Sequence, residues 1–443
     1  MSEQPVSAEE TTSTDAPEAR MPSAAGASFK GPMPAAADVA LEDILPVHPR
    51  LFSENRWHEY FARLREEDPV HFNETETAGR FWSLSRYADI KKADTDWKNF
   101  SSAHGITLGF PVGAELPEGM LQTTTFIAMD PPVHDAQRKA VAGSVAPTNL
   151  HNMETLIRER TCAVLDGLPE GETFDWVETV SIELTTMMLA TLFDFPFEDR
   201  SKLTRWSDVT FAIPQPGGII ETVDQRREEL LECLQYFTRL KEERLQNPGH
   251  DLVSMMAHGE DTKDLSPMEY LGNLLLLIVG GNDTTRNTMS GSVYSLNKFP
   301  DKFTKLAANQ ELIPQMVAEV IRWQTPLAYM RRTANNDCIV GGKQIKAGDQ
   351  MLMWYLSGNR DEDVFERGEE LIIDRQNARN HLSFGFGIHR CMGNRLAEMQ
   401  LRVLWEEILK RFENIEVVGD VERTFSSFVK GYTSMPVRVT RKK

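Results

Sequence analysis

A cysteine stands inside a glycine-rich stretch near the C-terminus, HLSFGFGIHRCMG at residues 381–393. Glycine lets a backbone turn sharply and pass close to a flat ligand. A helical pattern begins directly after the stretch, at Asn394. The thiolate of a cysteine at the start of a helix is favoured by the helix dipole and by free amide groups. The stretch therefore suits a soft metal held by one anionic sulfur, that of Cys391.

Three other uses of residues 381–393 are open on the loop alone. A zinc cage fits poorly, because no second cysteine lies at a CxxC-like distance. A phosphate-binding loop would need a Lys-Ser or Lys-Thr pair after its glycines, and the stretch has neither. The third use is a glycine-rich turn around a buried structural cysteine.

A second group that could do chemistry lies in the middle of a long helical pattern, residues 267–298. The pattern opens with a capping box, SPME at 266–269. At 1.5 Å per residue it would form a rod of about 48 Å, long enough to cross a domain. A buried Asp283 beside the hydroxyl of Thr284 would form a short relay able to pass protons. The alternative is a simple kink at Gly280-Gly281, since glycine weakens a helix interior.

Two further pairs have helical spacing. His134 and Arg138 are four residues apart, hence on one helix face, and an imidazole beside a guanidinium suits a carboxylate. The alternative for this pair is an exposed helix face. Glu319 and Arg322 are three apart, and on a surface such a pair would contribute only about 0.3–0.5 kcal/mol.

These patterns, taken together and in this order, resemble the haem-thiolate family of the cytochromes P-450, from about residue 45 to the end of the chain. The motifs that carry the resemblance are Asp130-Pro-Pro-x-His134-x-x-x-Arg138, Gly280-Gly-x-Asp283-Thr284, Glu319-x-x-Arg322 and Phe384-x-x-Gly387-x-His389-x-Cys391-x-Gly393. Many members of the family carry alanine at the position of Gly280.

The resemblance implies a mainly α fold with small β-sheets: the cytochrome P-450 fold, a triangular prism with haem between the central long helix and the Cys-loop helix. It implies haem b (iron protoporphyrin IX) as the cofactor, with Cys391 as the iron ligand. The other residue roles it implies are haem contact by Phe384, propionate neutralisation by His134, Arg138, Arg332 and His389, proton delivery by Asp283 and Thr284, and a buried brace of Glu319, Arg322 and Arg375.

The composition limits the class of protein. A net charge of −18 and a pI near 5.1 argue against nucleic acid and against an anionic membrane surface. Four scattered cysteines are too few for a disulfide scaffold, and no apolar run is long enough to span a membrane. We expect a soluble, cytoplasmic, bacterial protein with a disordered tail at residues 1–40 and a single cytochrome P-450 catalytic domain at residues 41–443.

The resemblance also implies a reaction and its partners. We expect a monooxygenase that takes O2 and two electrons from a separate ferredoxin and ferredoxin reductase, because too few residues follow Cys391 for a fused reductase. Since such ferredoxins are commonly acidic, docking would need a local basic patch around Arg138, Lys139, Arg390 and Arg395.

The substrate is expected to be a hydrophobic small molecule. The pocket residues that we expect are apolar and offer no anchor charge: Leu121, Leu277, Gly280, Leu327, Met330 and Phe428. The segments FIAMDPPVHDAQRK and IVGGNDTTRN resemble the bacterial branch that hydroxylates alkanes and fatty acids at the terminal carbon.

Other activities remain as alternatives. Another monooxygenase specificity, for a terpene or a steroid-like substrate, is the main one. A haem-thiolate peroxygenase or isomerase would not need Asp283 and Thr284, and a haem sensor would carry an output domain that the sequence does not show.

Overall fold

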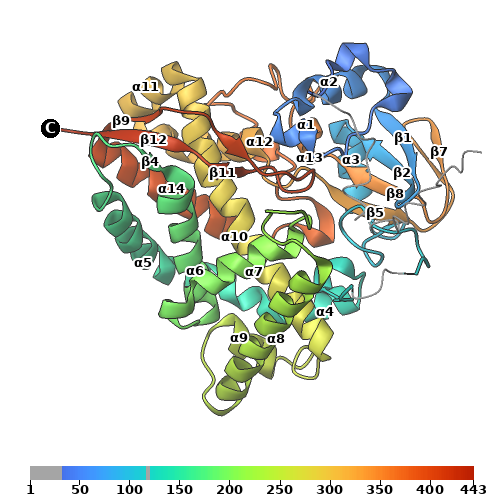
Figure 1. Cartoon of the computed structure of the whole chain (residues 1–443), viewed down its shortest axis with the longest axis horizontal. Helices are drawn as coiled ribbons and strands as arrows, with labels where there is room; N and C mark the ends of the chain where they lie inside the picture. The colour runs from blue at the N-terminus through green and yellow to red at the C-terminus, as the bar shows by residue number, and fades with distance from the viewer. Residues whose placement is uncertain (1–31, 116–119) are drawn as a thin grey trace, which may run out of the picture.

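The computed structural model describes residues 32–115 and 120–443. Helices form most of the described chain, and the outline is roughly triangular, with small sheets at the right and at the upper left (Figure 1). This agrees with the predicted fold class. Within the described residues, no helix is long and apolar enough to cross a membrane.

The helices occur along the whole described chain. They are α1 (Arg50–Ser53), α2 (Trp57–Glu67), α3 (Tyr87–Thr95), α4 (Val133–Ala142), α5 (Pro147–Asp166), α6 (Glu183–Phe193), α7 (Ser201–Phe211), α8 (Val223–Gln246), α9 (Leu252–His258), α10 (Pro267–Lys298), α11 (Pro300–Ala308), α12 (Ile313–Gln324), α13 (Tyr355–Gly358) and α14 (Asn394–Arg411).

The strands form one larger sheet and several small ones. They are β1 (Val70–Thr75), β2 (Gly79–Leu84), β3 (Phe100–Ser101), β4 (Phe174–Asp175), β5 (Met330–Ala334), β6 (Cys338–Val340), β7 (Lys343–Ile345), β8 (Gln350–Met353), β9 (Phe412–Val417), β10 (Glu422–Arg423), β11 (Tyr432–Ser434) and β12 (Pro436–Arg441). The larger sheet has the order β1-β2-β8-β5-β3, in which only β2 and β8 run parallel. The others have the orders β4-β12-β9, β10-β11 and β6-β7. The sheet that contains β1, β2, β5 and β8 lies at the right of Figure 1, and the sheet of β4, β9 and β12 lies at the upper left.

The long helix α10 crosses the molecule and belongs to two hydrophobic cores (Figure 1). Its first half, including Leu271 and Leu274, packs in a core with α7 and α8. Its second half, including Met289 and Val293, packs in a core with α12 and α14. The helix starts at the predicted capping box and runs without interruption through Gly280-Gly281. The predicted central helix is therefore confirmed.

The N-terminal part of the described chain is packed where a disordered tail was predicted. Met33 and Ala36 are buried. Their backbone N–H groups donate to the carboxylates of Glu54 and Glu59, at 3.1 and 3.0 Å. The packed chain thus begins by residue 33, and the predicted boundary at residue 40 is too late. The rest of the predicted tail, residues 1–31, lies outside the described residues, and the single-domain division stays a prediction.

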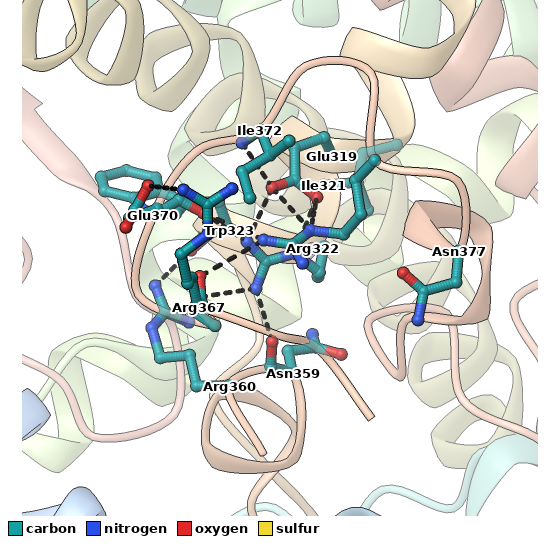
Figure 2. A network of polar contacts seen from close by, with 12 residues as sticks. Glu319, Ile321, Arg322, Trp323, Asn359, Arg360, Arg367, Glu370, Ile372 and Asn377 are labelled. Atoms are coloured by element: carbon teal, nitrogen blue, oxygen red, sulfur yellow. Dashed lines mark hydrogen bonds and ion pairs between the residues drawn. The ribbon is translucent and has the colours of Figure 1, made fainter. Parts of the chain in front are cut away.

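A buried ion-pair network ties α12 to the segment that precedes the Cys391 loop. Arg322 donates to both carboxylate oxygens of Glu319 at 2.8 Å, and Arg375 Nε donates to the same carboxylate at 3.0 and 3.1 Å. Arg322 also donates to main-chain carbonyls between residues 359 and 370 (Figure 2). Neither Glu319 nor Arg322 has exposed side-chain surface. The structure therefore brings together the three residues expected to form a brace.

Replacing Glu319 by Gln should lower the free energy of unfolding by about 3–5 kcal/mol, because two buried guanidinium groups then lose their countercharge. Urea unfolding of the purified protein measures this change. The control is Glu311→Gln, an exposed side chain just before α12, which should change stability by no more than about 0.5 kcal/mol. Equal unfolding midpoints for the two variants would show that the network does not brace the fold.

Candidate active site

Cys391 lies in a loop that passes very close to the C-terminal end of α3. Gly385 and Gly387 have backbone φ angles of 65° and 67°, in the left-handed region that favours glycine. A Cβ atom on Gly387 would lie 2.8 Å from the main-chain oxygen of Asp94, so a side chain there would collide with α3. The N–H of Cys391 donates to the carbonyl of Phe384 at 2.8 Å. The loop is thus closed directly before α14.

The environment of the Cys391 thiol combines opposing effects. Burial raises the pKa of the thiol, whereas the N–H of Gly393 and the guanidinium groups of Arg138 and Arg390 lower it. The net direction is upward, so the helix start alone does not make this sulfur a thiolate. A bound metal cation would deprotonate it outright. The side chain has exposed surface and is among the residues that line the cavity described next.

A cavity of about 650 Å³ lies between α10 and the Cys391 loop. Gly280 and Thr284 line it from α10, and Phe384 and Cys391 line it from the loop. All six residues predicted for the substrate pocket are among its lining residues: Leu121, Leu277, Gly280, Leu327, Met330 and Phe428. The structure therefore places the candidate sulfur and the candidate substrate pocket in one space.

One end of the cavity is rich in polar groups without partners. Arg138, Arg332 and His389 line it, and the ring of His134 packs edge-on against His389, with centroids 4.3 Å apart. His134 Nε2, both ring nitrogens of His389 and Arg332 Nε are buried without a hydrogen-bond partner in the described chain. Buried polar atoms are rarely left unpaired in native proteins. This set of groups fits the anionic, oxygen-rich edge of haem b, as expected for these four residues.

His389 differs from a simple cation at this end of the cavity. Burial, together with Arg332, lowers the pKa of His389 to about 2. A neutral imidazole can form a hydrogen bond to a carboxylate but does not neutralise its charge. The role that fits His389 is therefore a hydrogen bond to a haem propionate, in place of the charge neutralisation that was expected. His134 Nδ1 lies 2.8 Å from Asp135 Oδ1, which leaves Nε2 for another partner.

The two central residues of α10 face different surroundings. Thr284 lines the cavity, and its hydroxyl donates to the carbonyl of Gly280 at 2.8 Å. Asp283 is buried outside the cavity lining, where it accepts from Ser207 Oγ at 3.1 Å and lies 2.9 Å from Arg286 Nη2. Burial raises the pKa of Asp283, and Arg286 opposes that rise. The carboxyl can therefore hold a proton more readily than an exposed aspartate.

Sequence reasoning missed a buried carboxylate behind the cavity wall. Asp94, at the end of α3, lies 2.6 Å from Arg332 Nη2 and is almost fully buried. Nothing in the local pattern distinguishes this aspartate from Asp89 or Asp96 in the same segment.

Sequence reasoning also missed charge in the substrate pocket. Arg226 and Arg227, near the start of α8, line the cavity, so the expectation of a pocket without an anchor charge is wrong. Arg226 donates to the carbonyl of Ala212, and burial lowers the pKa of Arg226 to about 10. No aspartate or glutamate of the described chain lines the cavity. The helical segment that contains Arg226 and Arg227 is strongly charged, and such a pattern in a sequence indicates a solvent-exposed helix face.

Comparisons with known proteins agree with this geometry. The sequence profile of the Cytochrome P450 family matches residues 118–431. Linalool 8-monooxygenase from Pseudomonas putida is 34% identical over 88% of this chain and 97% of its own length.

Solved structures extend the similarity to the fold. Cytochrome P450-153 from Novosphingobium aromaticivorans is 45% identical, with a TM-score of 0.82, and CYP153D17 from Sphingomonas sp. PAMC 26605 is 47% identical, with a TM-score of 0.83. Each comparison covers 89% of this chain and 98% of the solved one. The predicted P-450 fold is confirmed, and with it haem b bound through a cysteine thiolate as the cofactor. The chain therefore belongs to the cytochrome P450 family of haem-thiolate monooxygenases.

Proposed function

We propose that this monooxygenase hydroxylates the terminal carbon of medium-chain alkanes or fatty acids, with O2 and with two electrons from a ferredoxin. The observation that carries the proposal is the cavity, whose largely apolar wall leads to Cys391 and Thr284. Similarity to two CYP153 structures, at 45% and 47% identity, supports the resemblance to the terminal-hydroxylating bacterial branch. A cytoplasmic setting in a bacterium is part of the proposal, and the bacterial source of these relatives supports it.

Different side chains of the protein would have different roles in the reaction. Haem b held by Cys391 supplies the oxidation of the substrate by O2. Arg138, Arg332 and the two histidines would hold its anionic edge, and the apolar wall would exclude water and present the chain end. Asp283 would take protons from the α7 side, and the Thr284 hydroxyl would pass them into the cavity.

The charge of the cavity favours a fatty acid over an alkane. Arg138 and Arg332 belong to the end expected to hold the haem propionates. Arg226 and Arg227 come from α8 and have no such role, yet they line the same cavity. A guanidinium binds a carboxylate through strong, charge-assisted hydrogen bonds. A fatty acid could therefore place its carboxylate at α8 while its methyl end approaches Cys391.

A terpene is the second candidate substrate. Linalool 8-monooxygenase, 34% identical to this chain, is named for a terpene alcohol. A compact terpene alcohol carries no anionic group and would make no use of Arg226. The relative response to linear acids and to terpenes therefore separates the two candidates.

Electron delivery would use a basic patch on the Cys391 side. Arg138 Nη2 donates to the carbonyl of Arg390 at 2.5 Å, so α4 and the Cys391 loop are adjacent. Lys139 on α4, Arg390 in the loop and Arg395 at the start of α14 are all exposed. In a chain with a net charge of −18, this local positive charge could attract an acidic ferredoxin.

Replacing Asp283 by Asn should slow substrate hydroxylation by roughly 10²-fold or more, because the amide cannot take up and release a proton. The substrate-induced spectral shift of the ferric protein should persist, since Asp283 does not line the cavity. The rate of product formation at saturating substrate and electron donor measures the effect. Asp301→Asn, an exposed change on α11, should leave turnover unaltered. Wild-type turnover in the Asp283 variant would exclude the relay.

Replacing Arg226 by Leu should weaken binding of a medium-chain fatty acid about 10- to 100-fold, from loss of a charged hydrogen bond of roughly 1.5–3 kcal/mol. Binding of an alkane of the same length should change little. Spectral titrations of the ferric protein with the acid, the alkane and linalool measure these affinities.

The matched control is Arg239→Leu, at an exposed position on the same helix. Equal losses for acid and alkane in the Arg226 variant would rule out the carboxylate anchor. If the wild-type protein shows a spectral shift with linalool and with neither the acid nor the alkane, the substrate is a terpene and the proposed substrate is wrong.

The double variant Lys139→Gln/Arg395→Gln should reduce the association rate with ferredoxin several-fold at low ionic strength, and the difference should shrink as salt is added. Stopped-flow reduction of the ferric protein gives this rate. Arg438→Gln/Lys443→Gln removes two exposed charges near the C-terminus and serves as the control. Identical rates for the two double variants would contradict docking at the basic patch.

A further inference from the structure

Asp94 is a buried carboxylate that accepts three hydrogen bonds. Its Oδ1 accepts from Arg332 Nη2 at 2.6 Å. Its Oδ2 accepts from the Tyr355 hydroxyl at 2.9 Å and from the backbone N–H of Phe386 at 2.7 Å. Only 1% of the side chain is exposed. Burial raises the pKa of Asp94, and the three donors oppose that rise. A carboxylate that only accepts, one bond coming from a guanidinium, fits the ionised form.

Asp94 contacts residues that line the cavity but does not line the cavity itself. Arg332 and Tyr355 line the cavity, whereas Asp94 does not. Phe386 belongs to the Cys391 loop, and a Cβ atom on the neighbouring Gly385 would lie 3.2 Å from Asp94 Oδ2. One carboxylate thus fixes a guanidinium on the cavity wall and also fixes the loop that carries the sulfur.

The ion pair has an electrostatic consequence for a redox cofactor. Arg332 already has a full countercharge from the protein, so the anionic edge of haem b would share that guanidinium with Asp94. A negative charge near iron stabilises the oxidised, more positive state relative to the reduced state. A buried charge is screened much less than one on the surface.

We propose that Asp94 is a positioning residue of the haem b site, one that holds Arg332 and the Phe386 end of the Cys391 loop and whose charge lowers the reduction potential of the bound haem. The inference rests on the family's cofactor and on the proposed contact of Arg332 with it. It does not depend on the substrate.

The midpoint potential of the substrate-free protein tests the charge directly. Asp94→Asn keeps the shape of the side chain and removes its charge. The ratio of reduced to oxidised protein at a fixed potential should rise roughly tenfold, which corresponds to an upward shift of about 59 mV in the midpoint potential of a one-electron couple. Asp96→Asn is the control, because Asp96 lies two residues away and its carboxylate accepts from the backbone N–H and the side-chain amide of Asn99. A midpoint equal to that of the control would overturn the electrostatic role.

A second variant tests the positioning role even if Asp94→Asn does not retain haem. Asp94→Glu keeps the charge but moves the carboxylate by one methylene. Its midpoint should stay near the wild-type value, while transfer of its haem to apomyoglobin should become several-fold faster. Haem loss at the wild-type rate in Asp94→Glu would overturn the positioning role.

Arg332→Gln separates this inference from the proposed role of Arg332 itself. That variant should lower the midpoint potential and speed haem loss. The effect of Asp94→Asn should be smaller in the Arg332→Gln background, because residues that act through one another are not additive. An undiminished effect of Asp94→Asn there would show that Asp94 does not act through Arg332. Wild-type behaviour of Arg332→Gln alone would instead refute the contact of Arg332 with haem.

Discussion

The Cys391 loop lies directly against the C-terminal end of α3, and this close approach positions the residue that lines the cavity opposite α10. That approach requires a glycine at 387, where a Cβ atom would lie 2.8 Å from the Asp94 carbonyl. Asp94 also binds the loop through the N–H of Phe386. The start of the loop is held separately, because Asn359 Oδ1 accepts from the N–H of Leu382 at 2.6 Å. Asn359 in turn accepts from Arg322 of the buried network. The ligand loop is therefore held at two points before Cys391, namely Leu382 and Phe386, by buried polar groups.

The distribution of charge around the cavity follows from the same arrangement. The protein carries a net charge of −18, yet arginines line the cavity in the described chain and no carboxylate does. The two carboxylates that bear on the site, Asp94 and Asp283, both lie behind its wall and are paired with Arg332 and Arg286. A dianionic cofactor and an anionic substrate could thus enter without meeting a like charge. In the roles proposed above, Asp283 would supply protons to that space and Asp94 would tune its electrostatics.

Local sequence patterns were sufficient to predict the parts of the site that depend on short spacing. The capping box at Ser266 and the apolar period predicted α10, whereas the residues around Cys391 were predicted from the resemblance to the cytochromes P-450. The relay of Asp283 and Thr284 was predicted as a pair, but successive helical residues point about 100° apart, and the structure places them on different sides of the cavity wall.

Contacts between distant segments could not be predicted in this way. The three hydrogen-bond partners of Asp94 lie 238, 261 and 292 residues along the chain, so no local pattern marks it. Arg226 sits in a charged helical segment that resembles a solvent-exposed face. The burial of Met33 depends on bonds to Glu54, which the Ala- and Pro-rich composition of the N-terminal segment does not reveal.

The central claim is that Cys391 alone supplies the sulfur that holds the haem iron. The ferrous–carbon monoxide spectrum of Cys391→Ala, measured beside that of Cys338→Ala, tests it most directly, because a thiolate ligand shifts the Soret band of that complex far to the red. The shifted band should be present in the wild type and in Cys338→Ala and absent in Cys391→Ala. A shifted band that survives in Cys391→Ala would place the ligand elsewhere and contradict the account.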